Sequence, residues 1–336
     1  MLQRSSTLQM MCVAAGLLLA SPALAQTPMP ATKTSLVPFD ISPFPYRGII
    51  PEKGIAFMDV VNGERHGHTS PRGGVYWEDL TYSDRRVLLS IPRGFDARRP
   101  AVIVVYLHGN LATLGRDVRD RQGVPRQVAE SGLNAVLVAP QFAVDAADSS
   151  SGRFWEPGVF AKFINEAVER LTRLHGDPRA RSAFEQAPVI IAAYSGGYNP
   201  AAYALAIGGV GERVQGVILL DGLFAEYDKF ADWIAHHPQA FFFSAYGKAA
   251  RSEHAELQRL LAERRVTYQT TMPARLTPGS VTLLAVPDEV KHNDFVTQSW
   301  VADPLKLALA RVPGFARTAT TTPLKNPPKS PPDKKR

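Results

Sequence analysis

The chain has 336 residues, of which 45% are hydrophobic and 21% are charged, with one cysteine and a formal net charge of +7. This length suits one large domain or two small ones, and the composition excludes wholesale disorder, collagen-like structure and repeat architectures. The positive charge suggests nucleic acid or an anionic surface as a partner, provided that the charge lies in the folded part of the chain.

The first 25 residues have the pattern of a secretory signal peptide. Arg4 precedes an apolar run from Met10 to Ala20, and Ala23-Leu24-Ala25 forms a small-residue site that predicts cleavage after Ala25. The run is about half the roughly 20 residues that a membrane-spanning helix needs, so no stable membrane insertion is expected. Cys12 lies in this segment, so the mature chain would have neither a disulfide nor a thiol nucleophile. We expect an exported protein, periplasmic or secreted.

Most of the positive charge lies outside the expected folded unit. Residues 317–336 carry six cations and one anion, and Arg4 adds one charge, which leaves about +1 for residues 26–316. The expected partner is therefore a small molecule or a peptide, and not nucleic acid. The tail 317–336 is rich in proline and lysine and is expected to be disordered, whereas residues 26–46, with five prolines, are expected to form an extended arm. The folded domain is expected to span residues 47–316.

Between these ends the chain alternates buried strands with helices. Continuous apolar runs predict strands buried on both faces at Ala101–Leu107, Asn134–Ala139, Val189–Tyr194, Val217–Leu220, Phe241–Ala245 and Val281–Val286. Apolar residues from Phe160 to Leu174 have the spacing of a core-facing helix. Val75–Thr81 and Val87–Ile91 flank a turn at Ser83-Asp84 and predict an antiparallel hairpin. The whole pattern predicts an α/β fold, with a mostly parallel sheet covered by helices on both faces.

The most informative segment is Val189–Ala206, where a predicted strand ends in Ala193-Tyr194-Ser195-Gly196-Gly197 and a helix of small residues follows. This segment matches the nucleophile elbow G-x-S-x-G, with Ala193 in the place of the first glycine. Small residues on both sides of the serine allow a sharp turn between strand and helix. The helix N-terminus beside the serine favours developing negative charge. Ser195 is therefore the candidate nucleophile.

A serine nucleophile needs a base and an orienting acid. His292 follows the last apolar strand and is the candidate base, because the other histidines lie in the polar N-terminal region, in a supporting loop, at helix ends or on a predicted helix surface. Asp221 ends the strand after the serine strand, and the next strand ends without an acid, which favours Asp221. Asp288 and Asp294, in the loop that carries His292, are the rival acids.

The loop Leu107-His108-Gly109-Asn110-Leu111 is a candidate oxyanion hole, in which the backbone N–H of Asn110, or alternatively of Leu111, would act with that of Gly196. With these motifs and the chain order Ser195, Asp221, His292, residues 75–313 resemble the serine hydrolases of the α/β-hydrolase superfamily. The resemblance implies acyl transfer through an acyl-enzyme, with no metal and no organic cofactor.

The loop after Pro140 should lie at the carboxyl edge of the sheet, where ligands bind. Arg153, Phe154 and Trp155 in this loop, and Tyr194 beside the serine, are candidate substrate-binding residues, although the loop residues could instead pack onto the core. The expected function is hydrolysis of a carboxylic ester. The alternatives are a peptidase or amidase that acts on envelope-derived peptides with the same triad, and a non-catalytic binding protein on a hydrolase fold.

Overall fold

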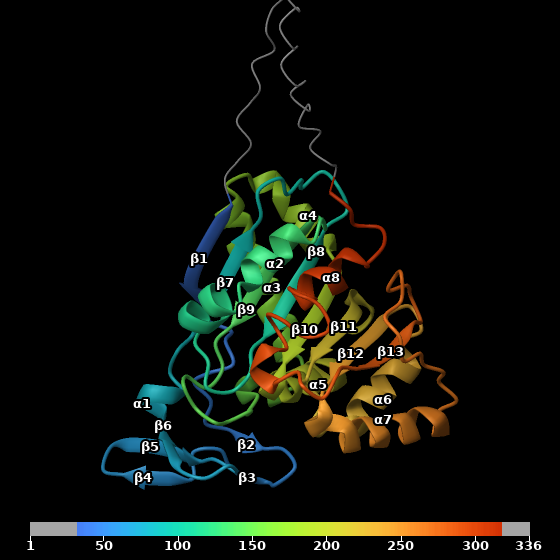
Figure 1. Ribbon diagram of the computed structural model, residues 1–336. Helices are drawn as coiled ribbons and strands as arrows, with labels where there is room; N and C mark the ends of the chain where they lie inside the picture. Colours follow the sequence, from blue (N-terminus) through green and yellow to red (C-terminus); the bar gives the residue numbers. More distant parts are fainter. Residues whose placement is uncertain (1–31, 318–336) are drawn as a thin grey trace, which may run out of the picture.

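The computed structural model describes residues 32–317, and an eight-stranded sheet forms their centre (Figure 1). In spatial order the strands are β1 (Lys33–Pro38), β7 (Arg86–Ile91), β9 (Ala135–Pro140), β8 (Val102–Leu107), β10 (Val189–Tyr194), β11 (Val214–Leu220), β12 (Phe241–Tyr246) and β13 (Val281–Ala285). From β9 to β13 all neighbours are parallel, whereas β7 pairs antiparallel with both β9 and β1. The expected mostly parallel sheet of an α/β-hydrolase fold is confirmed.

Two hydrophobic cores lie on opposite faces of this sheet, because successive side chains of a strand point to opposite sides. In β8, Ile103 and Val105 belong to one core, and Val102 and Val104 belong to the other. The first core is covered by α3 (Val159–His175), α4 (Arg181–Gln186), α5 (Tyr198–Ile207), α6 (Tyr227–His236) and α7 (Arg251–Glu263). The second is covered by a helical segment with π-type turns (Leu114–Arg121), α2 (Val124–Glu130) and α8 (Pro304–Ala310). Helices therefore cover both faces, as the alternating pattern predicts.

Short 3₁₀ turns complete the connections at Gly152–Trp155, Pro178–Ala180, Ser195–Gly197, Gly211–Arg213, Lys248–Ala250 and His292–Asp294. Three of these turns follow strands at the carboxyl edge of the sheet, after β10, β12 and β13. Chain segments from distant parts of the sequence therefore meet at one edge, where ligands bind in open α/β sheets.

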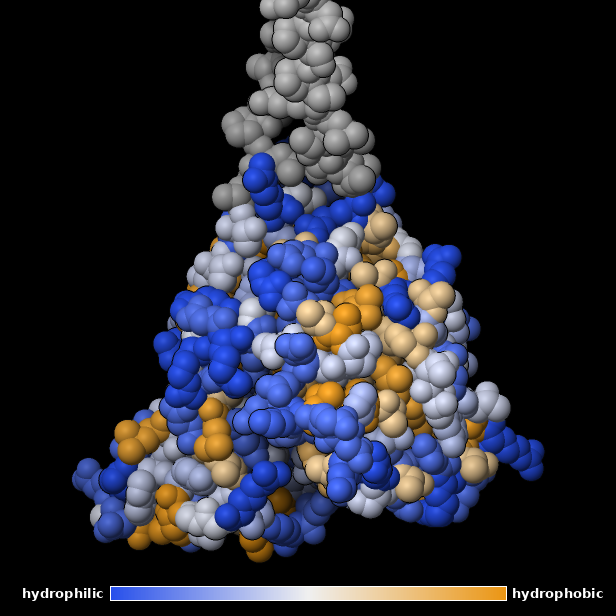
Figure 2. Space-filling view, viewed as in Figure 1, coloured by the Kyte–Doolittle hydropathy of each residue, from blue (hydrophilic) through white to orange (hydrophobic). Residues whose placement is uncertain are grey.

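A small β unit precedes the sheet strand β7 along the chain. It consists of β2 (Ile49–Ile50), β3 (Ile55–Ala56), β4 (Val60–Asn62), β5 (Arg65–Thr69), β6 (Val75–Trp77) and the short helix α1 (Glu78–Thr81). The N-terminal antiparallel pairing is present, but its residues differ from the expectation: Val75–Trp77 pairs with β5, and Arg86–Ile91 joins the large sheet. Aliphatic side chains of this region are exposed at Ile49, Ile55, Val61, Val75 and Leu80, and Figure 2 shows hydrophobic atoms over it at the lower left.

The expectation of an extended arm over residues 26–46 is wrong for the part that the structure describes. Lys33–Pro38 forms the edge strand β1, and the aromatic side chains of Phe39, Phe44 and Tyr46 are buried in the first core. Their rings bury apolar area in the core and so fix this segment to the domain, which the high proline content of the sequence did not indicate. The expected signal peptide, residues 1–25, and all of the expected tail except Arg317 lie outside the described residues. Within residues 32–317, no helix combines the length and apolar character needed to cross a membrane.

Candidate active site

Ser195 lies on the sharp turn between β10 and α5. Its backbone φ is 51°, in the left-handed region that a non-glycine residue rarely adopts. Two residues on, a side chain at Gly197 would place its Cβ 2.3 Å from the carbonyl oxygen of Leu107, at the end of β8. The turn is therefore held against the neighbouring strand, and only glycine fits there. This is the elbow that the small residues around Ser195 predict.

His292 reaches Ser195 from the loop after β13. Its Nε2 lies 2.7 Å from Ser195 Oγ, and its Nδ1 lies 2.6 Å from Asp221 Oδ2. The ring is partly open, with its side chain 38% exposed, whereas Ser195 is 8% exposed. A serine, an imidazole and a carboxylate in one hydrogen-bond chain allow the imidazole to accept the hydroxyl proton while the carboxylate holds its tautomer.

Asp221, and not Asp294 or Asp288, is the carboxylate that contacts His292. It follows β11 with a φ of 44° and is 1% exposed. Its second oxygen, Oδ1, accepts a hydrogen bond of 2.9 Å from the backbone N–H of Gly247, which follows β12. The segment after β12, which lacks an acid, therefore donates a hydrogen bond to Asp221, the acid that follows the neighbouring strand β11. These two hydrogen bonds offset the cost of burying the charge.

Tyr194 supports His292 and does not line the pocket described below. Its ring stacks on the imidazole with centroids 5.2 Å apart, and its hydroxyl donates to the His292 carbonyl oxygen at 3.0 Å. Burial raises the pKa of Tyr194 to about 12, so the phenol stays a proton donor at neutral pH. The sequence placed Tyr194 near the site correctly, but its contacts make it a positioning residue for the imidazole.

The expected oxyanion loop lies beside Ser195, with one correction. A Cβ on Gly109 would lie 2.7 Å from the Ser195 Cβ, so this loop approaches the serine as closely as a residue without a side chain allows. The backbone N–H of Leu111 donates to the Ala146 carbonyl oxygen at 2.9 Å and is therefore not free to bind an oxyanion. The prediction of Leu111 as the alternative oxyanion donor is wrong. The N–H groups of Asn110 and Gly196 remain the candidate oxyanion donors.

Three other histidines are buried, and two of them, His108 and His254, lie outside the pocket described below. His108 supports its loop, as expected: its Nδ1 donates to the Gly109 carbonyl and its Nε2 accepts from the Phe142 N–H, and burial lowers its pKa. His254, expected on a helix surface, is fully buried and contacts Ser244 Oγ at 2.8 Å. Burial lowers the pKa of His254 to about 4, which keeps its ring neutral. Neither ring contacts Ser195.

The expected substrate residues of the loop after Pro140 divide into two groups. Phe154 is fully buried and packs edge-on against the rings of Phe160 and Phe163, so its assignment to a substrate pocket is wrong. Arg153 donates to the Asp40 carbonyl oxygen at 3.1 Å and thereby holds the N-terminal segment, and it does not line the pocket described below. Trp155, in contrast, lines a pocket.

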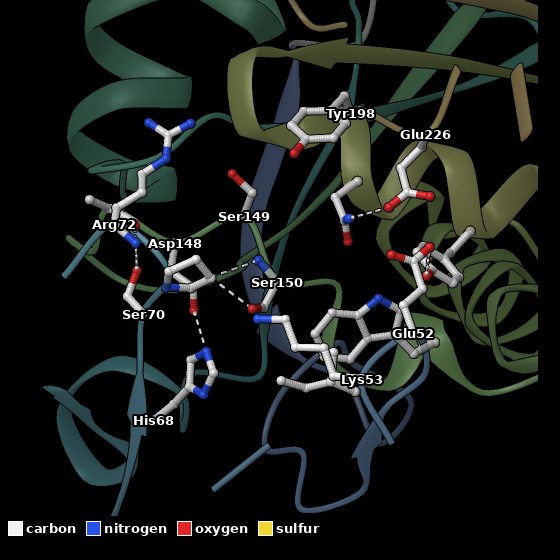
Figure 3. Close-up of a pocket in the computed structure, with 16 residues that line it drawn as sticks. Glu52, Lys53, His68, Ser70, Arg72, Asp148, Ser149, Ser150, Tyr198 and Glu226 are labelled. Atoms are coloured by element: carbon white, nitrogen blue, oxygen red, sulfur yellow. Dashed lines mark hydrogen bonds and ion pairs between the residues drawn. The ribbon is translucent and has the colours of Figure 1, made fainter. Parts of the chain in front are cut away.

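This pocket has a volume of about 190 Å³ and lies between the small β unit and α5 (Figure 3). The small β unit and the segments joining its strands contribute Ile50, Glu52, Lys53, His68, Ser70, Pro71 and Arg72, and the remaining walls are Ala147, Asp148, Ser149, Ser150, Trp155, Tyr198, Asn199, Tyr203 and Glu226. Ser149 Oγ donates to Asn110 Oδ1 at 3.1 Å. It also lies close to Gly196, since a Cβ added to that glycine would be 2.6 Å from Ser149 Oγ. The pocket therefore adjoins the candidate oxyanion donors.

Sequence reasoning missed the wall that the small β unit supplies. The His66-x-His68 spacing within β5 was the available signal, since residues two apart share one face of a strand, and His68 is buried there. No local pattern marks Lys53 or Arg72, because both occupy turns between very short strands. Within the described part of the chain, no group of three or more His, Cys, Asp or Glu residues could hold a metal ion.

No protein-family model and no curated protein matches this chain. Among solved structures, a feruloyl esterase module from Clostridium thermocellum complexed with sinapinate is 12% identical at a TM-score of 0.44, covering 80% of this chain and 94% of that one. An S-formylglutathione hydrolase from Agrobacterium tumefaciens is 16% identical at 0.41, covering 75% and 97%. An IroE-like serine hydrolase from Shewanella oneidensis is 13% identical at 0.39, covering 67% and 72%. These likenesses are remote, so the fold assignment rests on the strand order and the elbow.

Proposed function

We propose that this chain is an exported serine hydrolase that cleaves a carboxylic ester of a small molecule through an acyl-enzyme. The observation that carries the proposal is the unbroken hydrogen-bond chain from Ser195 Oγ through His292 to Asp221. The strained backbone at Ser195 adds support, since strain at a non-glycine residue clusters at active sites. Export is supported by the signal-peptide pattern before Gln26.

In the proposed reaction, Ser195 Oγ attacks the ester carbonyl carbon while His292 Nε2 accepts the hydroxyl proton. Asp221 stabilises the imidazolium that forms. The negative charge on the carbonyl oxygen receives hydrogen bonds from the backbone N–H groups of Asn110 and Gly196. His292 then donates its proton to the leaving alcohol, and water attacks the acyl-enzyme by the same steps.

The test is labelling with a fluorophosphonate probe, followed by mapping of the modified residue, together with turnover of a panel of p-nitrophenyl esters and amino-acid amides. We expect the probe to modify Ser195 and the wild-type chain to hydrolyse esters. Ser195→Ala should lose the label and lower kcat by about 10⁴-fold or more, because the nucleophile is removed.

The matched control is Ser182→Ala, which changes a serine of α4 whose hydroxyl accepts a hydrogen bond from Gln186 and has no contact with the site. It should keep both the label and the turnover. Ester turnover that survives in Ser195→Ala would exclude the elbow serine as nucleophile. Hydrolysis of amides at rates equal to those of esters would redirect the proposal to an amidase, and absence of labelling in the wild type would favour a binding protein.

A further inference from the structure

The pocket beside Ser195 contains buried polar atoms that have no protein partner. Trp155 Nε1 and His68 Nε2 line it without a hydrogen bond among the described residues, and both side chains are more than nine-tenths buried. Asn110 Nδ2 is also unpartnered, and Oδ1 of the same side chain accepts from Ser149, a residue of the pocket wall. An indole N–H and a carboxamide NH₂ can only donate, so a ligand atom that accepts hydrogen bonds would satisfy them.

His68 has one ring nitrogen committed to the protein. Its Nδ1 lies 2.7 Å from the Phe57 carbonyl oxygen, which accepts its proton, and the Asp59 carboxylate is 3.7 Å from the same nitrogen. Its Nε2 faces Asp148 Oδ2 at 4.0 Å, beyond hydrogen-bond distance. With the proton on Nδ1, Nε2 of the neutral ring is a hydrogen-bond acceptor, so His68 is open to a donor group of a ligand and not to its carboxylate.

Each of the three carboxylates of the pocket, in contrast, already has a protein donor. Glu52 and Glu226 both bind the ammonium group of Lys229, at 3.0 and 2.5 Å. Asp148 accepts hydrogen bonds from the Tyr82 hydroxyl and from Ser150. The three carboxylates are thus held by protein donors, and the pocket offers a ligand mainly donors.

Two cations at the rim are unpaired. The side chains of Lys53 and Arg72 are exposed and form no ion pair within residues 32–317. Figure 3 shows Arg72 on the opposite side of the pocket from Glu52 and Glu226. Burial and the Glu226 charge raise the pKa of Tyr198, the first residue of α5, and the charge of Arg72 opposes that rise.

We propose that this pocket is a substrate subsite for a carboxylate, in which Lys53 and Arg72 bind the carboxylate oxygens while Trp155 and Asn110 donate to other oxygen atoms of the substrate. This inference rests on the proposed function, and it makes the substrate an ester that carries a second, ionised carboxyl group. The pocket volume of about 190 Å³ is below the range that drug-sized ligands fill, which fits a small substituent.

The experiment compares each carboxylate ester with its own methyl-capped form. One pair, mono-p-nitrophenyl glutarate and its methyl ester, carries the carboxylate on the acyl side. The other pair, 4-acetoxybenzoate and its methyl ester, carries it on the leaving group. The readout is the ratio of kcat/KM within each pair, and a loss of folded protein cancels in this ratio because both esters meet the same sample.

We expect the wild type to prefer the carboxylate in at least one pair by about tenfold, since charge-assisted hydrogen bonds form only with the ionised group. The double variant Lys53→Ala/Arg72→Ala should abolish this preference. Arg98→Ala removes an exposed cation from the loop before β8 and should leave the ratio unchanged. The pair that responds also identifies whether the subsite takes the acyl or the alcohol side.

Equilibrium binding to Ser195→Ala, measured by isothermal titration calorimetry, separates this inference from the proposed function. Tighter binding of 4-acetoxybenzoate or mono-p-nitrophenyl glutarate than of its methyl ester, lost when Lys53 and Arg72 are also replaced, would support the subsite even if no ester were hydrolysed. Equal ratios in the wild type and the double variant, or equal binding of both members of both pairs, would overturn the carboxylate subsite and leave the triad untouched.

Discussion

Asp221 is the residue whose two carboxylate oxygens have separate partners, Gly247 N–H and His292 Nδ1. In Asp221→Asn, the Gly247 N–H can still donate to the remaining carbonyl oxygen, but the side-chain NH₂ faces His292 and favours the wrong imidazole tautomer. We expect kcat for ester hydrolysis to fall by about 10⁴-fold with little change in KM. Steady-state kinetics on one p-nitrophenyl ester measures both constants.

The control for this prediction is Asp294→Asn, in the loop that carries His292. The Asp294 backbone carbonyl accepts from Thr297 N–H and Gln298 N–H, so the substitution keeps these bonds. Activity should stay close to that of the wild type. A large loss in Asp294→Asn combined with a small one in Asp221→Asn would reassign the acid.

Residues that follow buried strands could be located from the sequence. Ser195, Asp221 and His292 each come after an apolar run, and parallel strands bring their carboxyl ends to one edge. The positions of Arg153 and Phe154 could not be predicted in this way. Their side chains contact the Asp40 carbonyl oxygen and the phenyl rings of α3, which belong to distant segments of the chain. A local pattern does not show which distant segment will cover a loop.

At the scale of elements, the N-terminal segment is attached to α3 through Glu166. The Glu166 carboxylate accepts hydrogen bonds from the backbone N–H groups of Asp40 and Ile41 and pairs with Arg170 at 2.8 Å. Burial alone would raise the pKa of Glu166, but these hydrogen bonds and the Arg170 charge together lower it. The carboxylate thus joins the turn after β1 to the helix that covers the first core.

Because the pKa of Glu166 is lowered in the folded state, its ionised carboxylate stabilises the fold at pH values above the ordinary glutamate pKa. This stabilisation is lost as the pH falls through the pKa that Glu166 has in the folded protein. We expect Glu166→Gln to lower the free energy of unfolding at pH about 7 by about 2 kcal/mol, because two backbone donors lose a charged acceptor. The difference from wild type should shrink below pH about 4. Urea denaturation at both pH values measures it.

Glu185→Gln provides the comparison, since Glu185 forms an exposed pair with Arg181 in α4. Exposed pairs of this kind contribute little, so its effect should be small at both pH values. A Glu166→Gln difference that is equally large at the lower pH would show that the carboxylate charge does not attach the segment.

Element prediction succeeded where the hydrophobic pattern was long and failed where strands were short. The runs of β8, β9 and β10 are apolar throughout, which indicates burial on both faces. The small β unit has strands of two to five residues with mixed exposure, and its pairing depends on contacts across the chain. Strand β1 was not predicted because the sequence around it is rich in proline, although an edge strand tolerates proline.

At the scale of the whole molecule, the proposed export makes the mature chain begin at Gln26. When the full sequence is expressed in a Gram-negative host, we expect the chain recovered from the envelope fraction to start at Gln26, as intact mass and N-terminal sequencing would record. Ala25→Asp should block cleavage, because the cleavage site needs small residues.

The matched control for this prediction is Ala31→Asp, which introduces the same charge at an alanine downstream of the expected cleavage site. It should leave the processing unchanged, because the residues that the cleavage site needs all precede Gln26. Recovery of an uncleaved chain that begins at Met1 from the cytoplasmic fraction of wild-type cells would contradict export.

The order of the proposed triad along the chain has a consequence for biosynthesis. Synthesis proceeds from the N-terminus, so Ser195 and Asp221 exist before His292 does, and the imidazole reaches them only when the loop after β13 has docked beside Tyr194. A nascent or truncated chain that ends before this loop therefore carries a serine without its base. The proposed hydrolytic activity is acquired last, after all eight strands of the sheet have been made.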